Sequence, residues 1–452
     1  MPLTQEARGI VLPMTVSALF LAWFIRRLGQ MSGETPIVEV GAWYAVAGTI
    51  YLLLPLSVFL ALGMVFVPTS DGRLFSLQPD PGEVARIAWM YVIHIGAFGL
   101  AYVSVRGRPK NESREQVVSR RTMVTGLVLF VVLSTGLYGI NMLLPRPENY
   151  ADSYAVVMAL PLGVRQALKF VFGVNFVITI LLLVGAFSDY RRWRRVILMW
   201  LAFQFLMTIL FGIRAGLVLS FCACIILYHL KVRRIRMLAA SLLALSAVVG
   251  FLVLGIVRNY RGAERRADFT VALNGGEFEA LFANAVDIDR RRQTGEIDGA
   301  PPGAYLADFV APIPSQILPF EKVNLATWYV GRFYPSAREQ GGGFAFGVIA
   351  QSALGYGWLE LVTRGIVLGW VLAKTHRLFS RRRGELWITV FYVWLIVNGY
   401  QSFRDTSFTL WSSFVQQFVP AFIIVECLAA ILAQVSRLSG RPARTSPAVT
   451  PS

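Results

Sequence analysis

Long apolar runs separated by short polar loops make up most of the chain. Each run approaches the length of about 20 residues with which a helix crosses a bilayer core of about 30 Å. The runs lie near residues 10–25, 42–67, 85–105, 122–143, 165–187, 196–212, 215–230, 237–257, 358–375, 386–402 and 408–435. This pattern predicts an all-α polytopic membrane protein with about eleven transmembrane helices.

The apolar run from Ile37 to Val67 leaves the number of spans open, because Pro55 interrupts it. A single helix there gives eleven spans and an external N-terminus, which Arg26 and Arg27 at the end of the first run favour. Two shorter crossings give twelve spans and an internal N-terminus. The first residues have neither a basic start nor a small-residue cleavage site, so we expect no removed signal peptide.

Basic clusters lie between the apolar runs and predict the orientation of the chain. They are RGRPKNESREQVVSRR at 106–121, RRWRR at 191–195, KVRRIR at 231–236, RLFSRRR at 377–383 and the tail residues Arg437, Arg441 and Arg444. Short loops rich in Lys and Arg mark the cytoplasmic side of a membrane. We therefore expect the segments 68–84, 144–164, 258–357 and 403–407 to lie outside.

The composition agrees with a membrane protein. The chain is 56% hydrophobic and only 15% charged, and its mean hydropathy is +0.57. The net charge of +17 would suit a nucleic-acid partner. Because the positive residues are distributed over short loops between spans, we expect no nucleic acid among the partners.

The external segment 258–357 is far longer than the other loops. Loops of this length in a compact protein are usually functional or disordered, and its Trp, Tyr and Phe content predicts a folded cap over the bundle. Within the cap we expect a flexible stretch at 290–303. The rest of the chain divides into an N-terminal bundle of eight spans at 1–257, C-terminal transmembrane helices at 358–435 and a cytoplasmic tail at 436–452.

The end of the cap is rich in glycine and partly polar, although it adjoins hydrocarbon. Residues 341–355 include several glycines and Gln351, and Tyr356 follows them. Irregular backbone at membrane depth is tolerated only where protein or a watery cavity covers it. We expect an interfacial or re-entrant helix near 341–355, with the next span beginning near Trp358. The alternative is that the glycines from 355 to 369 only allow tight helix packing.

Arginines at the external ends of the spans are the main candidates for chemistry, since the positive-inside rule disfavours them there. A guanidinium offers a rigid fork of donors that suits phosphate, and it keeps its charge. A lipid diphosphate would explain the group; the alternative is that long arginine side chains snorkel at helix ends and pair with nearby acidic residues. The external arginines are Arg214, Arg258, Arg261, Arg265, Arg266, Arg332, Arg338 and Arg404.

Other chemistries have less support in the sequence. His94, His229 and His376 all lie outside the cap, so we expect neither a histidine base nor a metal site there. We expect His94 to pack against a neighbouring helix and Glu360 to pair with Arg364 one helical turn later. The inner halves of the helices are interpreted as apolar, which disfavours a transporter. Candidates for a general base in the cap are Glu277, Glu279, Asp287, Asp289, Glu296, Asp298, Asp308 and Glu321.

Four stretches resemble the Wzy-type O-antigen polymerases, the repeat-unit polymerases of bacterial surface polysaccharide. FGIRAGLVLSFCACIILYHL at 211–230 is similar to the arginine-start helix of the family, and VLGIVRNYRG at 253–262 is similar to its arginine–tyrosine exit into the large loop. DFVAPIPSQILPFEKVN at 308–324 resembles a proline-bounded segment, in which Ser315 stands where arginine is frequent. The glycine-rich stretch at 341–372 resembles a helix pair of the family.

This resemblance, which covers roughly residues 200–400, implies a glycosyltransferase with a GT-C-like fold in the bacterial inner membrane and an active site facing the periplasm. Such an enzyme moves a growing glycan from undecaprenyl diphosphate to a newly arrived lipid-linked repeat unit, as in O-antigen and lipopolysaccharide biosynthesis. It implies no cofactor and no metal. The implied partners are the undecaprenyl-diphosphate-linked oligosaccharide, the lipid bilayer and a chain-length regulator.

The arginines then take predicted roles. Arg214, Arg258 and Arg261 are the catalytic candidates, because they would hold the diphosphate as its charge develops. The substrate-binding candidates are Tyr260, Arg265, Lys322, Arg332, Tyr334, Arg338 and Arg404, with Tyr305 also on the glycan side. Two alternatives stay open: an O-antigen ligase, against which the lack of a histidine in the cap counts, and a polysaccharide flippase or exporter, which needs a charged path through the spans.

Overall fold

The computed structural model describes most of the chain in continuous stretches. These are residues 5–32, 36–63, 65–68, 74–77, 79–107, 119–144, 159–211, 214–236, 277–313, 317–335, 346–406 and 408–438. Isolated positions between 156 and 250 are described as well.

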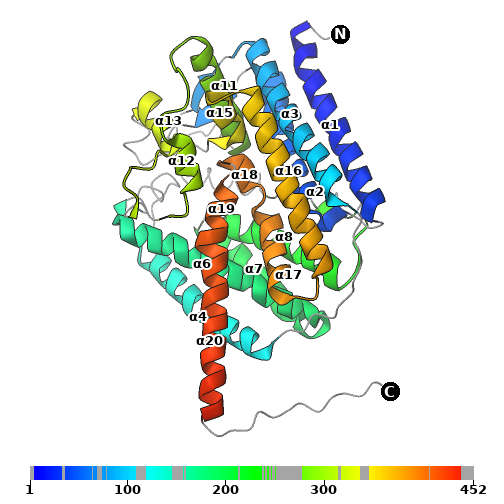
Figure 1. Ribbon diagram of the computed structural model, residues 1–452, viewed down its shortest axis with the longest axis vertical. Coiled ribbons are helices and arrows are strands. Elements are labelled where there is room, and N and C mark those ends of the chain that lie inside the picture. The colour runs from blue at the N-terminus through cyan, green and yellow to red at the C-terminus, as the bar shows by residue number, and fades with distance from the viewer. Residues whose placement is uncertain are drawn as a thin grey trace.

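Helices form nearly all of the described structure (Figure 1). The bundle consists of α1 (Gln5–Ser32), α2 (Val40–Leu62), α3 (Pro81–Arg106), α4 (Arg120–Leu143), α6 (Leu162–Ser188), α7 (Tyr190–Phe211), α8 (Arg214–Lys231), α16 (Trp358–Arg381), α17 (Leu386–Asn398), α18 (Gln401–Arg404), α19 (Thr409–Ser413) and α20 (Val419–Leu438). The π-helix η3 (Phe414–Phe418) joins α19 to α20, and the 3-10 helix η1 (Pro36–Val38) precedes α2. The cap contains α11 (Glu277–Gln293), α12 (Ala304–Phe309), α13 (Leu325–Phe333) and α15 (Gly347–Leu354).

Each predicted span overlaps a single helix, with three exceptions. The span 386–402 is divided between α17 and α18, the span 408–435 comprises α19, η3 and α20, and only isolated positions of 237–257 are described. Six helices in the described part of the chain are long and apolar enough to cross a membrane. Many of their apolar side chains face outward, for example Leu19 (66% exposed) and Val132 (61% exposed). Exposed apolar surface of this extent is typical of a protein surrounded by lipid. The chain is therefore a helical membrane protein.

The two ends of the bundle differ in character. At the end that we call the basic end, the backbone carbonyl of Val105 near the end of α3 accepts a hydrogen bond from Arg377 of α16 (3.3 Å). Glu426 of α20 accepts from Trp387 at the start of α17 (2.7 Å) and from Thr122 at the start of α4 (3.4 Å). The basic loops of the sequence analysis adjoin these helix ends, and the cap lies at the opposite end (Figure 1).

The N-terminal helices settle one question that the sequence left open. α2 runs through Pro55 without interruption, so the run from Ile37 to Val67 supplies one helix and not two. Its 23 residues span about 34 Å, enough for a single crossing. α1 begins at the cap end, where Gly9 lies beside Ala85 near the start of α3 (Figure 1). The total of eleven spans stays a prediction.

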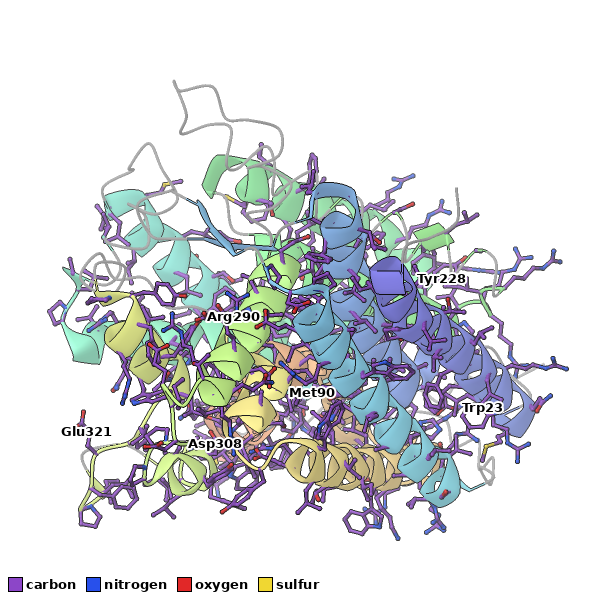
Figure 2. All side chains as sticks on the ribbon, turned by 90° about the horizontal axis from the view of Figure 1, so that it is seen from above. Trp23, Met90, Tyr228, Arg290, Asp308 and Glu321 are labelled. Carbon is purple, nitrogen blue, oxygen red and sulfur yellow. The ribbon has the colours of Figure 1, made fainter. Side chains whose placement is uncertain are left out.

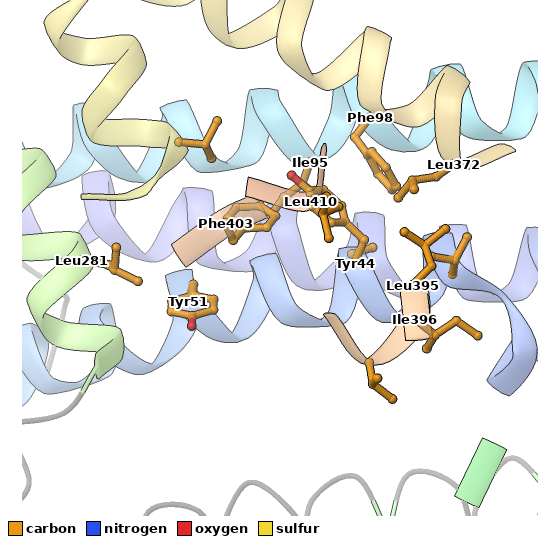
Figure 3. Packing of buried hydrophobic residues seen from close by; sticks show 14 of the residues in the cluster. Tyr44, Tyr51, Ile95, Phe98, Leu281, Leu372, Leu395, Ile396, Phe403 and Leu410 are labelled. Carbon is orange, nitrogen blue, oxygen red and sulfur yellow. The ribbon is translucent and has the colours of Figure 1, made fainter. Parts of the chain in front are cut away.

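Aromatic and aliphatic side chains pack together in the interior of the bundle (Figure 3). The Phe403 ring of α18 lies 4.7 Å from the Tyr44 ring of α2 and 5.3 Å from the His94 ring of α3, measured between centroids. The Tyr44 hydroxyl and His94 Nε2 are 2.8 Å apart, and His94 Nδ1 lies 3.1 Å from the carbonyl oxygen of Leu361. The prediction that His94 packs against a neighbouring helix is confirmed.

Two glycines let α16 pack closely on α3, the most extensive helix pair in the described chain. A Cβ atom on Gly365 would lie 2.9 Å from the carbonyl oxygen of His94. A Cβ atom on Gly369 would overlap the carbonyl oxygen of Phe98. Tight helix packing therefore accounts for the glycines of the second half of the 341–372 stretch.

Three features differ from the predictions. The helical fold class is confirmed, but the sequence did not predict one short antiparallel hairpin of β1 (Val65–Pro68) and β2 (Leu74–Leu77), whose apolar and β-branched residues suit a strand. The span predicted at 386–402 is divided, because α17 ends at Asn398 and α18 begins at Gln401 beneath α15.

The stretch at 290–303 was expected to be flexible, yet it forms the last turn of α11 and a compact turn. The backbone nitrogens of Glu296 and Ile297 donate to the carbonyl of Arg291 at 2.8 and 3.3 Å. The guanidinium of Arg291 also pairs with Glu296 at 2.6 Å. Local charge pairing thus orders a segment whose composition is that of a loop.

Candidate functional site

The helical path is interrupted between α15 and α16, where the cap meets the bundle. α15 is buried over its whole length and packs on α11 and α18. The backbone nitrogens of Gly355 and Gly357 donate to Gln351 (2.9 Å) and Ser352 (2.7 Å), and Gly357 has a φ of 62°, which favours glycine. A helix lies at 347–354 within the stretch where an interfacial or re-entrant helix was predicted, and the next helix begins at Trp358 as expected. The interfacial or re-entrant position of the first helix stays a prediction. Residues 341–345 lie outside the described part.

Glu360, in the first turn of α16, collects three donors at this break. The Tyr305 hydroxyl of α12 donates to Glu360 Oε2 at 2.6 Å, and the backbone nitrogen of Tyr356 donates to the same oxygen at 3.0 Å. Arg364 Nε donates to Glu360 Oε1 at 2.7 Å, which confirms the predicted ion pair. Gly355 makes this arrangement possible, because a Cβ atom there would overlap both the Tyr305 hydroxyl and Glu360 Oε2.

Asp308 of α12 is the second carboxyl group of the junction. Gln351 Nε2 of α15 donates to Asp308 Oδ2 at 2.5 Å, and the Thr406 side chain also bonds this carboxyl group. Asp308 is only 9% exposed. Burial raises the pKa of Asp308; the bond from Gln351 and the charge of Arg364 lower it, and the charge of Glu360 raises it.

We call these residues the junction cluster: Tyr305, Asp308, Gln351, Glu360, Arg364 and Thr406. Two of its buried atoms, Gln351 Oε1 and Arg364 Nη1, have no hydrogen-bond partner among the described residues. Buried polar atoms in native proteins are almost always paired, so each exception needs an explanation. One acceptor and one donor beside two carboxyl groups form a pattern that a hydroxylated ligand could complete.

Aromatic rings border the junction cluster. The Tyr305 and Tyr356 rings are stacked with centroids 5.9 Å apart, and the Phe309 and Phe408 rings lie 4.5 Å apart. The Arg364 guanidinium lies over both the Tyr305 ring (6.0 Å) and the Phe408 ring (5.8 Å). Tyr356 and Phe309 are 74% and 63% exposed. Aromatic rings that are exposed at the surface therefore adjoin the cluster.

α11 of the cap is joined to α3 of the bundle by ion pairs (Figure 2). Arg290, labelled in that view from the cap end, pairs with Glu83 of α3 at 2.6 Å, and Arg86 of α3 pairs with Asp289 at 2.5 Å. Arg292 Nη1 donates to the carbonyl oxygens of Ala353 (2.9 Å) and Leu354 (2.6 Å) and also to that of Gly355. These bonds satisfy the free carbonyl groups at the C-terminus of α15, where the helical path is interrupted.

A separate polar group lies on α11 and α13. Asp287 Oδ2 accepts hydrogen bonds from the Tyr329 hydroxyl (2.5 Å), the Tyr334 hydroxyl (3.0 Å) and Arg291 Nε (2.9 Å). Arg291 also lies 4.3 Å from the centroid of the Phe333 ring. Every one of these contacts joins parts of the cap to each other, so this group stabilises the cap.

The predicted site residues within the described chain have different surroundings. Lys322 donates to the carbonyl oxygens of Ala311 (3.1 Å) and Ile313, and burial lowers its pKa. Arg332 is exposed on α13 beside Trp328, and Tyr334 bonds Asp287 as described above. Tyr305, which the sequence placed on the glycan side, is itself a member of the junction cluster. Arg404 ends α18, two residues before Thr406 of that cluster.

The other predicted residues cannot be placed as side chains. Arg214 is the first residue of α8, and its side chain lies outside the described structure. The remaining candidates fall outside the described residues altogether: Arg258, Tyr260, Arg261, Arg265 and Arg338. The roles of these arginines stay predictions.

Sequence reasoning did not select the members of the junction cluster as a group. Asp308 was one of eight acidic candidates, and Glu360 was assigned only an ion pair. The available signal was the polar Gln351 in a glycine-rich stretch, since a buried amide needs a partner. Nothing in the sequence connects it to Asp308, 43 residues earlier.

A second buried polar cluster lies at the basic end. Arg106 of α3 forms a two-pronged ion pair with Glu39, which precedes α2, and both side chains are 1% exposed. The Tyr102 hydroxyl donates to Glu39 at 2.9 Å, and His376 Nε2 lies 3.3 Å from it. Glu39 and Arg106 flank predicted spans, so nothing in the sequence indicated that they are buried and paired with each other.

The comparisons with known proteins add no relative. No protein-family model matches the chain, and neither the curated proteins nor the solved structures include a significant match.

Proposed function

We propose that this protein is a membrane glycosyltransferase that polymerises lipid-diphosphate-linked oligosaccharide units into a surface polysaccharide. The observation that supports it most is the junction cluster: a buried carboxyl group with a raised pKa stands beside a donor and an acceptor that have no partner among the described residues. It lies where a folded cap meets the membrane-spanning helices. A sugar attached to a lipid would arrive at that depth.

In the proposed reaction, the bond between the anomeric carbon of the growing glycan and its diphosphate breaks. A hydroxyl oxygen of the incoming unit forms the new bond to that carbon, its proton passes to a carboxylate, and the lipid diphosphate leaves. Asp308 is the proposed base, because a raised pKa makes a carboxylate a better proton acceptor. The partner-free atoms of Gln351 and Arg364 would bond hydroxyl groups of the sugar.

Two further features support a glycan ligand. The exposed rings of Tyr356 and Phe309 offer flat apolar faces next to the cluster, on which the apolar face of a sugar ring can stack. The diphosphate would need cations, and Arg404 adjoins the cluster along the chain. In this proposal Arg214, Arg258 and Arg261 keep their expected role at the leaving group. The periplasmic orientation in a bacterial inner membrane is part of the same proposal.

One observation favours an exporter or flippase as a second candidate. The buried Glu39–Arg106 pair with His376 beside it places ionisable groups deep between helices, where transporters often carry relays. The aromatic packing around Phe403 lies between this cluster and the cap, however, and Glu39 is fully paired there. A structural role therefore explains the buried Glu39–Arg106 cluster more simply.

Surface and lipid-linked glycans from cells that lack the gene separate these functions. For a polymerase, single repeat units still reach the surface and long chains disappear; for a ligase, long chains stay on the lipid carrier; for a flippase, lipid-linked single units accumulate inside. Complementation with Asp308→Asn should fail to restore long chains. Asp298→Asn, which changes an exposed carboxylate of the same cap, is the matched control and should restore them. Equal ladders from the two variants would refute the role of Asp308.

A further inference from the structure

The outward side of α12 is apolar, although its inward side carries a carboxyl group. Leu306 and Phe309, which lie three residues apart on one side of the helix, are 50% and 63% exposed. Ile313 and Ile317 follow them in the chain and are exposed as well. Asp308 is buried in the junction cluster. We call the four exposed residues Leu306, Phe309, Ile313 and Ile317 the α12 face.

This arrangement is the reverse of the one that water favours. A surface helix in water turns its apolar side toward the core and its charged side outward. α12 instead buries Asp308, its only charged residue, and exposes Leu306 and Phe309. Single exposed apolar side chains are common on soluble proteins. In a lipid leaflet, however, the whole arrangement is favourable, because the apolar side chains contact acyl chains and the carboxyl group stays paired inside the protein.

Gln416 of η3 indicates the depth of the residues that follow α12. Its Nε2 donates to the carbonyl oxygens of Ala311 and Pro312, both at 3.4 Å. The helical stretch from Thr409 to Ser436 is long and apolar enough to cross the membrane, and its 28 residues measure about 42 Å. A hydrocarbon core of about 30 Å, centred on this stretch, begins about 6 Å from Thr409, and Gln416 lies about 10 Å from Thr409 along the axis. Ala311 and Pro312 therefore lie close to the edge of the hydrocarbon.

The backbone carbonyl groups at this depth are paired by side chains. Lys322 Nζ donates to the carbonyl oxygens of Ala311 (3.1 Å) and Ile313. Together with Gln416, it supplies donors to three consecutive carbonyl groups at 311–313. Lipid offers no hydrogen bonds, so irregular backbone near the hydrocarbon must be paired within the protein. A loop in water has no such requirement.

The α12 face adjoins the membrane-facing surface of the bundle. The Phe309 ring lies 4.5 Å from the ring of Phe408, which directly precedes α19, and Trp411 of α19 is exposed nearby in the chain. Tryptophan is enriched where a spanning helix passes the lipid headgroups. Seen from the cap end, Glu321, which follows this segment, lies at the outer edge of the molecule (Figure 2). This part of the cap therefore lies at the side of the bundle, where lipid surrounds it.

We propose that the α12 face inserts into the lipid leaflet on the cap side and contacts its acyl chains. Three observations select a lipid surface as the partner: the outward side chains are apolar, the carbonyl groups near the hydrocarbon edge are paired, and the face adjoins a spanning helix. The proposal does not depend on the glycan chemistry. Because α12 also carries Asp308, the junction cluster then lies at the depth of the lipid headgroups.

The test places a spin label on the full-length protein in lipid nanodiscs that hold one copy each. The label sites are Leu306→Cys and Ile313→Cys, whose side chains are exposed, so the replacements should not impair folding. Cys427, the exposed native cysteine, is replaced by alanine, and the signal of this parent after the same labelling is subtracted.

Two matched controls define the scale of the measurement. Asp298→Cys reports an exposed position of the same cap, and Ile423→Cys reports an exposed apolar position of α20. The measured quantity is the ratio of collisions with dissolved oxygen, which concentrates in lipid, to collisions with a polar nickel chelate, which stays in water. We expect the ratios at 306 and 313 to exceed the ratio at 298 by at least about tenfold and to approach the ratio at 423.

Two outcomes would overturn the proposal. Ratios at 306 and 313 equal to the ratio at 298 would place the α12 face in water. Protection from both reagents, either in nanodiscs or only in vesicles that hold many copies, would show that protein covers the face; protection in the vesicles alone would identify a second copy as the occupant.

Discussion

Gly355 offers a sharp test of the junction, because a single methyl group there meets two functional side chains. In Gly355→Ala the new Cβ atom would overlap the Tyr305 hydroxyl and Glu360 Oε2. The hydroxyl and the carboxylate would have to separate, and the 2.6 Å hydrogen bond between them would be lost. The substitution thus opens the junction cluster without removing any of its polar groups.

The expected change in the free energy of unfolding follows from the loss of the hydrogen bond between Tyr305 and Glu360. A hydrogen bond to a charged group contributes about 1.5–3 kcal/mol to stability. Replacing glycine by alanine also stiffens the unfolded chain, which offsets about 0.4–1 kcal/mol of the loss. We therefore expect Gly355→Ala to lower the free energy of unfolding by about 0.5–2.6 kcal/mol and to shorten the glycan chains.

Two other glycines supply the controls for this experiment. Gly96 of α3 has no atom within 4 Å of a built Cβ, so Gly96→Ala should be neutral or stabilise the helix by up to about 1 kcal/mol. Gly369→Ala should destabilise the α3–α16 contact by about 1–3 kcal/mol while leaving the junction intact. Thermal unfolding in detergent and glycan ladders from complemented cells measure the two effects. If Gly355→Ala behaves like Gly96→Ala in both assays, the account of the junction is wrong.

Three further predictions concern charged groups. Burial raises the pKa of Glu279 from 4.5 to about 7, so protonation favours the folded state, and the free energy of unfolding should fall by about 3 kcal/mol as the pH rises from about 4.5 past 7. Glu279→Gln should flatten this pH dependence in thermal unfolding measured at pH 5 to 8. An unchanged pH dependence in the variant would exclude Glu279 as its source. Arg106→Met should lower the free energy of unfolding by about 3–5 kcal/mol, because Glu39 is left buried without its partner. Adding Glu39→Gln should reduce that loss in the same thermal unfolding measurements. A double variant whose loss equals the sum of the two single losses would contradict this. In a purified transfer assay, Asp308→Asn should lower the rate by about 10²–10⁴-fold with unfolding unchanged, whereas Asp298→Asn should keep the normal rate.

The helices were predictable, because crossing a membrane imposes a length and an apolar composition that the sequence displays directly. The break before Trp358 was predictable for a related reason, since glycine at 355 and 357 interrupts an apolar run. The hairpin at 65–77 was not, because its short strands merge with the apolar end of α2 in the sequence.

The two buried clusters show why side-chain networks escape this kind of reasoning. Glu39 and Arg106 each flank an apolar run, so each resembles an ordinary residue at a membrane surface, and only their pairing at a separation of 67 residues draws them inside. Asp308 meets Gln351 for the same reason, through a chain path that no periodicity encodes. Sequence identifies which residues can do chemistry, and the fold decides which of them meet.

Reconstitution of the purified protein with a single kind of lipid-diphosphate-linked repeat unit tests the central claim most directly. The account predicts a ladder of lipid-linked chains that lengthen by whole repeat units, with one lipid diphosphate released for each unit added and no requirement for a nucleotide sugar. An unchanged pool of single units, in a preparation whose thermal unfolding is normal, would contradict it.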